Sequence, residues 1–418
     1  MNNRYFGVEP EEKLEYNRGM DMKKQLDEAY NPDRNARREK ILVALSGGIC
    51  SYISAYLLKL QKFDLVGVTV ITGWDQSPVP GSELFSCHID APRLEEIKEF
   101  CHRLGVPHYV VRASSEFQEQ VVEQWIGARL TGTHHSPCWS CHDLRLRVLV
   151  EKMRELEIDK LATGHFAKIL PESTGAYFVH SSNDEENDHS DLLSRLPSHI
   201  LGSLYLPLAD LTKKEVLKLA ENFGLPVTGD QVKVHQCLPW REEFLPYLEK
   251  TVPAKFLGGG NLWFQDEERE EGTHDGVVLH SYGDVLSTTA GGRAVLAGYK
   301  MNEKKLILRP EAYLYRNRVL LRQCKVSEGT PLTEPGRGVL CVEGQEIECW
   351  YHPKCLDSVF VEWEEELRIP EGTILALYKK KGKNAKVFLT GKVRYLPKIR
   401  PPEEGEQSVP KADYARDF

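Results

Sequence analysis

Two short stretches of this chain carry residues whose types and spacing could do chemistry. In the first, Cys138 and Cys141 form a Cys-x-x-Cys pair, and Cys237 is a third cysteine further along. We expect the pair to lie in a proline-flanked turn just before a helix. A thiolate near a helix N-terminus has a lowered pKa, which makes it a competent nucleophile or metal ligand. Three thiolates can also hold a four-iron cluster and leave one iron open for sulfide.

Other readings of these cysteines stay open. A structural zinc site would need a fourth ligand, such as His135, His142 or His235. Ten cysteines in 418 residues are too dilute for a disulfide scaffold, so thiol or metal chemistry in a reducing compartment is the interpretation to test. The seven cysteines outside the triad have spacings that favour packing roles: Cys50, Cys87, Cys101, Cys324, Cys341, Cys349 and Cys355.

The second stretch is Ser46-Gly47-Gly48-Ile49-Cys50-Ser51, which follows an apolar run and precedes an amphipathic one. The glycines let the backbone turn tightly, so that several N–H groups and a helix N-terminus converge on one anion. Ser46 and Ser51 can add hydroxyl donors. Gly-rich turns between a strand and a helix are common without any ligand. The position of this one on a first strand favours a phosphate loop.

The elements that must position these residues follow from periodicity. Apolar runs at 41–45, 65–70, 109–111 and 160–163 alternate with helical patterns, which predicts a doubly wound parallel α/β sheet. Ligands bind such sheets outside the carboxyl ends of the strands. A helix over 212–223 has a capping box from Thr212 and Glu215. The acidic tract 183–188 reads as a loop or mobile flap, and short strands after residue 276 predict a β-barrel.

The strand, Ser-Gly-Gly-x-x-Ser and helix resemble the PP-loop of ATP pyrophosphatases, a HUP-like fold. Further landmarks, in order along roughly residues 39–396, resemble the tRNA-specific 2-thiouridylase (MnmA) family of that class. They are Gly73-Trp74-Asp75, Ala162-Thr163-Gly164-His165-Phe166, Leu206-Pro207-Leu208 with Lys214-Glu215-Val216, Gly272-Thr273-His274-Asp275-Gly276, and Pro370-Glu371-Gly372.

The resemblance implies an ATP-dependent sulfurtransferase that thiolates tRNA or another structured RNA by adenylating a pyrimidine 2-carbonyl. It implies Cys141 and Cys237 as the catalytic cysteines, with sulfide or a persulfide carrier as the sulfur donor. ATP, with magnesium, would be bound by Ser46, Gly47, Gly48, Ser51, Gly164 and His165. The arrangement of Cys138, Cys141 and Cys237 also resembles iron–sulfur-dependent tRNA thiolases, so a [4Fe-4S] cluster and a persulfide route both stay open.

The expected organisation is a polar N-terminal extension (1–38), a PP-loop domain (39–205), a helical linker domain carrying Cys237 (206–270), a β-barrel (271–397) and a disordered tail (398–418). Two residues depart from the family pattern: Cys50 replaces an aspartate and Asn187 replaces a lysine. They motivate two alternatives. One is a related PP-loop sulfur or adenylation enzyme acting on another RNA or a small molecule. The other is a catalytically silent RNA-binding relative.

Composition restricts the cell compartment and the partners. The N-terminus lacks the apolar core of a secretory signal, and no apolar run is long enough to span a bilayer, so we expect a cytoplasmic protein with no membrane partner. The net charge of −8 argues against global coating by nucleic acid. Local basic patches remain candidates for RNA contact: 34–38, Arg145 with Arg147, and 379–383.

Overall fold

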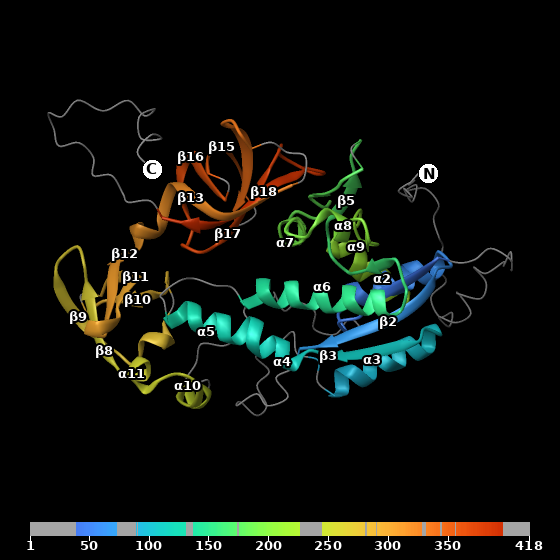
Figure 1. Cartoon of the computed structure of the whole chain (residues 1–418), viewed down its shortest axis with the longest axis horizontal. Helices are drawn as coiled ribbons and strands as arrows, with labels where there is room; N and C mark the ends of the chain where they lie inside the picture. The colour runs from blue at the N-terminus through green and yellow to red at the C-terminus, as the bar shows by residue number, and fades with distance from the viewer. Residues whose placement is uncertain are drawn as a thin grey trace.

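The computed structural model describes residues 39–72, 89, 91–130, 137–173, 175–225, 245–280, 282–289, 291–327, 332–342, 345–355 and 357–395. The expected N-terminal extension, the expected tail, the Gly73-Trp74-Asp75 motif and Cys237 lie outside the described residues. Figure 1 shows an elongated arrangement, with a parallel sheet and its helices at one end, a mixed sheet at the other and a barrel beside them. Among the described residues, no helix is long and apolar enough to cross a membrane.

The first unit is a five-stranded parallel sheet in the order β3-β2-β1-β4-β7. Its strands are β1 (Lys40–Ala44), β2 (Asp64–Ile71), β3 (His108–Arg112), β4 (Lys160–Ala162) and β7 (Leu204–Tyr205). The chain builds outward from β1 to β2 and β3, then crosses to β4 on the other side of β1. The strand order therefore reverses between β1 and β4, and such switch points are where open α/β sheets bind ligands. The predicted α/β fold class is confirmed.

Helices cover both faces of this sheet because its strands present apolar side chains on both sides. Ile41 and Val43 of β1 join the core made with α2 and α3, whereas Leu42 joins the core made with α5 and α6. This alternation is the two-residue period of a strand. The helices are α2 (Ile49–Leu60), α3 (Ala91–Leu104), α4 (Ser114–Phe117), a π-helical turn (Gln118–Val122), α5 (Glu123–Leu130) and α6 (Pro137–Glu155).

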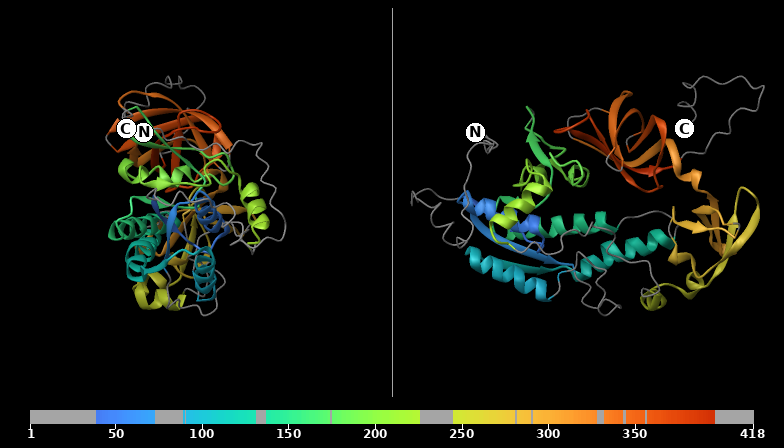
Figure 2. Two further views of the ribbon diagram at one scale, coloured as in Figure 1. Left: turned by 90° about the vertical axis from the view of Figure 1, so that its right-hand side faces the viewer. Right: turned by 180° about the vertical axis from the view of Figure 1, so that it is seen from behind.

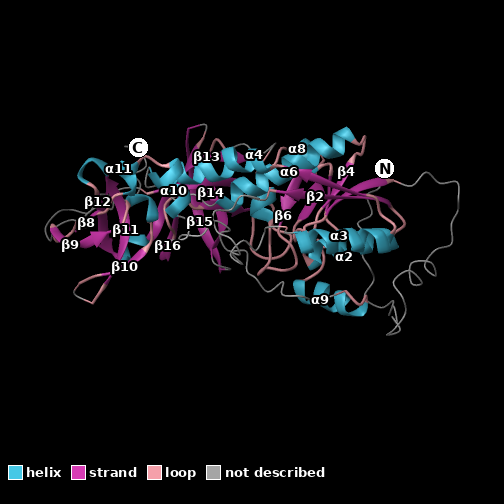
Figure 3. Ribbon diagram, turned by 90° about the horizontal axis from the view of Figure 1, so that it is seen from below, coloured by secondary structure: helices cyan, strands magenta, loops and turns pink. Residues whose placement is uncertain are grey.

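The described helices of the expected linker range pack against the same two cores. Val216 and Ala220 of α9 (Lys213–Asn222) are buried with α2, and Figure 3 shows α9 next to α2. Leu248 of α10 (Leu245–Thr251) and Val252, just before α11 (Ala254–Leu257), join the other core. Residues 213–257 thus extend the parallel-sheet unit where they are described.

The strands after residue 260 divide into two sheets, each with its own core. A mixed sheet has the order β10-β11-β12-β8-β9 and includes one parallel pair, β8 with β12. The closed barrel has the order β13-β16-β15-β14-β17-β18, and Figure 2 shows the two sheets from further sides. The single barrel expected over 271–397 therefore corresponds to a barrel over Tyr315–Arg394 preceded by a separate sheet.

The bounds of these strands are as follows. The mixed sheet contains β8 (Gly260–Phe264), β9 (Arg269–His274), β10 (Val285–Ser287), β11 (Arg293–Lys300) and β12 (Lys305–Pro310). The barrel contains β13 (Tyr315–Val326), β14 (Gly336–Val342), β15 (Gln345–Cys355), β16 (Ser358–Arg368), β17 (Ile374–Tyr378) and β18 (Val387–Arg394).

The barrel docks on a hairpin of β5 (Lys168–Pro171) and β6 (Tyr177–His180), followed by α7 (Ser190–Leu193) and α8 (Ser198–Leu201). Ser181 N donates to Ala385 O at 2.9 Å, and the hydroxyls of Ser190 and Tyr378 lie 2.9 Å apart. These hydrogen bonds join the parallel-sheet unit to the barrel, so they help to fix how the two units pack at this seam.

Candidate functional site

The Ser46–Ser51 loop joins β1 to α2 and is shaped by its own polar groups. Ser51 Oγ donates to Gly48 O at 2.7 Å and accepts from Ser46 N at 3.3 Å, while Gly48 N donates to Ser46 Oγ at 3.3 Å. Gly47 has a φ of +75°, in the left-handed region where only glycine is unstrained. The loop therefore turns tightly at the N-terminus of α2, which is the geometry that a phosphate loop requires.

Two cations flank this loop, and sequence analysis named neither. A Cβ placed on Gly47 would lie 2.6 Å from Nε of Arg93, so the Arg93 side chain packs directly on that glycine. From the other side, Lys213 Nζ donates to Cys50 Sγ at 3.3 Å. Arg93 comes from α3 and Lys213 from the first turn of α9, so two helices distant in sequence bring positive charge to the same loop.

Lys213 is held in place by a capping box and a buried carboxylate. Thr212 and Glu215 form the capping box that sequence analysis predicted, so α9 begins where expected. Lys213 N also donates to Asp184 Oδ2 at 2.6 Å. Burial alone would raise the pKa of Asp184, but this bond and those from Asn187 hold it below its usual value. Asp184 is therefore an ionised cap on α9.

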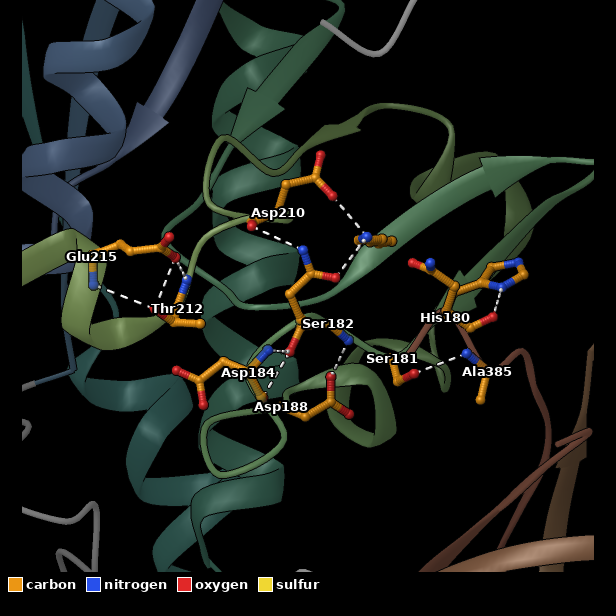
Figure 4. Close-up of polar contacts among 12 residues, drawn as sticks. His180, Ser181, Ser182, Asp184, Asp188, Asp210, Thr212, Glu215 and Ala385 are labelled. Atoms are coloured by element: carbon orange, nitrogen blue, oxygen red, sulfur yellow. Dashed lines mark hydrogen bonds and ion pairs between the residues drawn. The ribbon is translucent and has the colours of Figure 1, made fainter. Parts of the chain in front are cut away.

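The acidic tract around Asp184 is a loop, as expected, and hydrogen bonds within it give it a defined conformation. Asp184 is only 9% exposed, and its backbone N–H donates to Ser182 Oγ at 3.1 Å. Ser182 N donates to Asp188 Oδ1 at 2.7 Å. Figure 4 shows this cluster, with Asp184 and Asp188 on either side of Ser182. The carboxylates act as hydrogen-bond acceptors for the backbone, a role that residue composition alone did not reveal.

Gly164 and His165 follow β4 and lie against the phosphate loop. A Cβ on Gly164 would come within 2.9 Å of the carbonyl carbon of Cys50, so only glycine allows this approach to the first turn of α2. The next residue, His165, is half-buried, with Nδ1 at 2.8 Å from Thr163 Oγ1. Gly164 and His165, both expected in the nucleotide site, therefore lie next to the phosphate loop, where the strand order reverses between β1 and β4.

His165 belongs to a cluster of three neutral histidines. Its ring centroid lies 5.0 Å from that of His142 and 5.3 Å from that of His189. Burial lowers the pKa of His142 and of His189 to about 4, and it also lowers the pKa of His165. Neutral rings each have one donor and one acceptor nitrogen. The cluster is therefore uncharged at neutral pH.

The hydrogen bonds of this cluster indicate one tautomer for each of two rings. His142 Nε2 lies 3.1 Å from His165 Nε2, so one of the two nitrogens must carry the proton. His142 Nδ1 is buried and has no hydrogen-bond partner within the described part of the chain. An unpaired acceptor costs less there than an unpaired donor. We therefore assign the proton to His142 Nε2, with His165 accepting through Nε2 and donating through Nδ1 to Thr163.

Cys138 and Cys141 lie within the first two turns of α6, which begins at Pro137, rather than in a turn before it. Proline is well tolerated at a first helical position, and this helix start was set too late by sequence analysis. Cys141 is 7% exposed, and Cys138 is half-buried. His142, the next residue, reaches His165, so the start of α6 is tied directly to the side of the phosphate loop.

The meeting of the three sulfurs stays a prediction, because Cys237 lies outside the described residues. Within the described ranges, no group of three His, Cys, Asp or Glu side chains is arranged to hold a metal ion. Cys138 and Cys141 therefore do not complete a cluster site, or the alternative zinc site, with any described residue.

Comparisons with known proteins place this geometry in a family. Residues 39–238 match the model described as the tRNA methyl transferase HUP domain. The chain is 30% identical over 252 residues to the tRNA-specific 2-thiouridylase MnmA of Geobacter metallireducens, covering 59% of this chain and 67% of that protein. The chain belongs to the tRNA-specific 2-thiouridylase (MnmA) family. It is also 26% identical over 301 residues to the Clostridium acetobutylicum MnmA, covering 71% of this chain and 83% of the relative.

Among solved structures, the chain is similar to the U34-tRNA thiolase NcsA from Methanococcus maripaludis with its [4Fe-4S] cluster. The identity is 20%, the TM-score is 0.31, and the match covers 56% of this chain and 73% of that one. Similarity at this level is too low for the cluster of that protein to support a cluster in this 2-thiouridylase relative.

The two departures from the 2-thiouridylase pattern are connected in space. Asn187 Nδ2 donates to both carboxylate oxygens of Asp184, at 3.0 Å each, and Asp184 in turn holds Lys213. Lys213 then reaches Cys50. The backbone N–H and the side-chain ammonium of Lys213 thus link the position that lost a lysine to the position that lost an aspartate.

The basic patches expected to contact RNA are partly engaged within the protein. Lys381 forms an ion pair with Glu348 at 3.5 Å, and Lys379 Nζ lies 4.1 Å above the Phe388 ring. Arg145 Nη2 donates to Thr72 Oγ1 at 3.0 Å, and Arg147 donates to Gln120. Of these four groups, Lys381 is paired with a carboxylate, whereas the other three keep their charge because the partners in these contacts are neutral. Residues 34–38 lie outside the described ranges.

Proposed function

We propose that this protein is an ATP-dependent tRNA 2-thiouridylase that adenylates a pyrimidine 2-carbonyl and replaces its oxygen with sulfur. Membership of the 2-thiouridylase family supports the reaction. The observation that carries the proposal is the 3.1 Å contact between His142, beside Cys141, and His165, beside the phosphate loop. It supports the proposal because it holds Cys141, the proposed nucleophile, on the same edge of the sheet as the 46–51 loop. We place the reaction in the cytoplasm.

In the activation step, ATP binds as its magnesium complex at Ser46, Gly47, Gly48 and Ser51. Backbone N–H groups at the start of α2 hold the phosphates, and Arg93 and Lys213 neutralise their charge. Gly164 and His165 line the adjoining wall. The base oxygen attacks the α-phosphorus, pyrophosphate leaves, and the oxygen becomes part of an adenylate that can depart as AMP. Placing the reacting groups together is the main contribution that we assign to the loop.

In the sulfur step, Cys141 carries a persulfide delivered by a donor. Its terminal sulfur attacks the activated carbon and AMP leaves, which forms a carbon–sulfur bond. The Cys237 thiolate then attacks Cys141 Sγ, so the thiolated base is released and a Cys141–Cys237 disulfide forms. A thiol reductant returns both cysteines to thiols before the next turnover. Cys141 is held for this role in the first two turns of α6, next to His142.

The iron–sulfur alternative would use Cys138, Cys141 and Cys237 as the three ligands. The described residues supply two of these thiols and no third ligand near them, so they do not by themselves fit a cluster. We therefore route no step through one. Within the proposal, residues 39–205 activate the base, 206–270 supply Cys237, and the barrel within 271–397 contributes RNA contacts.

Two assays test the proposed function. ATP–pyrophosphate exchange that depends on tRNA would separate a 2-thiouridylase from a silent RNA-binding relative. Mass spectrometry of tRNA nucleosides after incubation with ATP, a persulfide donor and a thiol reductant should reveal a 2-thiolated pyrimidine. Cys141→Ser should abolish thiolation while pyrophosphate exchange persists, because adenylation precedes sulfur transfer. Exchange with a small molecule instead of RNA would favour the related PP-loop enzyme.

A further inference from the structure

A pocket of about 250 Å³ lies at the seam between the parallel-sheet unit and the barrel. One wall comes from Tyr177 and the segment 194–201, and the other from Lys325, Val326 and Ser327 at the end of β13. The volume corresponds to about eight water molecules at their liquid density. The pocket is therefore large enough for a small anionic group.

Two cations meet at this pocket. Arg195 is half-buried, and its Nη1 is inaccessible and has no hydrogen-bond partner among the described residues. Lys325 lies at the mouth, where Nζ donates to the Arg195 carbonyl oxygen at 2.9 Å. Burial lowers the pKa of both Arg195 and Lys325, which indicates that the pocket disfavours their charges.

The neighbouring carboxylate does not neutralise the pair. Asp143 acts on both cations, yet within the described ranges neither cation forms an ion pair with it or with any other carboxylate. Asp143 also interacts with Arg147, so its single charge is shared among three cations. The cluster keeps an excess of positive charge.

We propose that this pocket binds a backbone phosphate of the RNA substrate, clamped between Arg195 and Lys325. A buried guanidinium nitrogen without a partner is costly. A phosphate in the pocket would accept charge-assisted hydrogen bonds from the half-buried Arg195 guanidinium once the side chain turns this nitrogen toward the pocket. Because each unit contributes one cation, the bound strand would span the seam and fix its register on both units. The inference rests on the proposed RNA thiolation, since it names a contact that the substrate of that reaction would make.

The test compares the binding of a pool of unmodified tRNA transcripts at several salt concentrations. Arg195→Gln and Lys325→Gln should each weaken binding about tenfold at low salt. Each should also lower the slope of log K against log[salt] by roughly 0.7–0.9, the value for one lost phosphate contact. The double variant should lose little more than either single one, because both cations hold the same phosphate. Lys98→Gln is the matched control, since its ammonium is already paired with Glu95 at 2.6 Å.

A second variant protects the test against misfolding. Val326 is 37% exposed at the pocket wall, so Val326→Glu places a carboxylate beside the cations without disturbing the core. We expect this variant to melt at a higher temperature than the wild type and yet to bind tRNA more weakly. A purely structural role for the pocket would not move the two readouts in opposite directions.

Wild-type affinity and salt slope in folded Arg195→Gln and Lys325→Gln proteins would overturn the inference. The inference would also be wrong if the pocket bound only a free anion. Inorganic phosphate would then stabilise the wild type more than Arg195→Gln, while the two proteins bound tRNA with the same affinity. If the wild type itself bound no tRNA, the proposed function would fail first, and that outcome is distinct from the loss of the pocket alone.

Discussion

Replacing Lys213 with glutamine removes the ammonium that lies 3.3 Å from Cys50 Sγ at the phosphate loop, and it should weaken ATP binding. Two unit charges 4 Å apart interact by about 4 kcal/mol at the effective dielectric constant near a protein surface, roughly 20. Lys213 is half-buried and loses hydration when it binds phosphate, so the net contribution is closer to 1.5–3 kcal/mol, the range for a charged hydrogen bond. The dissociation constant should therefore rise about 10- to 100-fold.

Isothermal titration with a magnesium complex of an α,β-methylene ATP analogue measures this constant without turnover. Lys214→Gln is the matched control, because Lys214 is the adjacent lysine and is exposed. Its substitution should change the constant by less than about twofold, as expected for a screened surface charge. The capping box depends on Thr212 and Glu215, so the melting temperature of Lys213→Gln should stay near that of the wild type.

Equal affinity for the analogue in Lys213→Gln and the wild type would refute the reasoning, and the contact with Cys50 would then be structural only. A comparable loss in Lys214→Gln would also refute it, because the effect would then come from the overall charge of α9 rather than from one placed ammonium.

Three further perturbations test the site. Gly47→Ala should abolish nucleotide binding in a folded protein, because its φ of +75° strains alanine and the new Cβ meets Arg93; calorimetry with the same analogue would detect retained binding. If Cys138, Cys141 and Cys237 hold a cluster, anaerobically purified protein should be brown, and each single Cys→Ala change should remove the colour. Colour that survives the loss of one of these cysteines would exclude shared coordination. His189→Gln should reduce the loss of stability as the pH falls from 6.5 to about 4. Burial lowers the pKa of His189 to about 4, so between these pH values the unfolded chain binds a proton that the folded chain does not. If the melting temperatures of His189→Gln and the wild type changed equally with pH over this range, the prediction would be wrong.

Local signals in the sequence predicted much of the parallel-sheet unit. The glycines and serines of 46–51 marked the turn into α2, and the apolar runs at 41–45 and 65–70 marked β1 and β2. The capping box of Thr212 and Glu215 set the start of α9. Each of these features depends on residues within one or two helical turns, which is the range over which sequence patterns are informative.

Long-range contacts account for what the sequence did not predict. Arg93 and Lys213 reach the phosphate loop from α3 and α9, and no spacing rule connects them to Gly47 or Cys50. The parallel pairing of β8 with β12 makes the mixed sheet a separate sheet from the barrel. Strand length did not predict this division, because short strands occur in both sheets. Asp184 reads as part of a solvated tract, but it is buried because the start of α9 needs an acceptor.

The hydrogen bonds that run from Asn187 through Asp184 and Lys213 to Cys50 have an evolutionary consequence. A lysine at 187 would add an ammonium beside Asp184, which now accepts from the backbone N–H of Lys213 and from Asn187 and Glu186, and an aspartate at 50 would draw the Lys213 ammonium into an ion pair. Either reversion alone shifts the local charge by one unit, whereas both together leave it unchanged. We therefore expect the two positions to be epistatic. Lineages that exchange aspartate for cysteine at the loop should exchange the distant lysine within the same interval, and intermediates carrying one change should be rare.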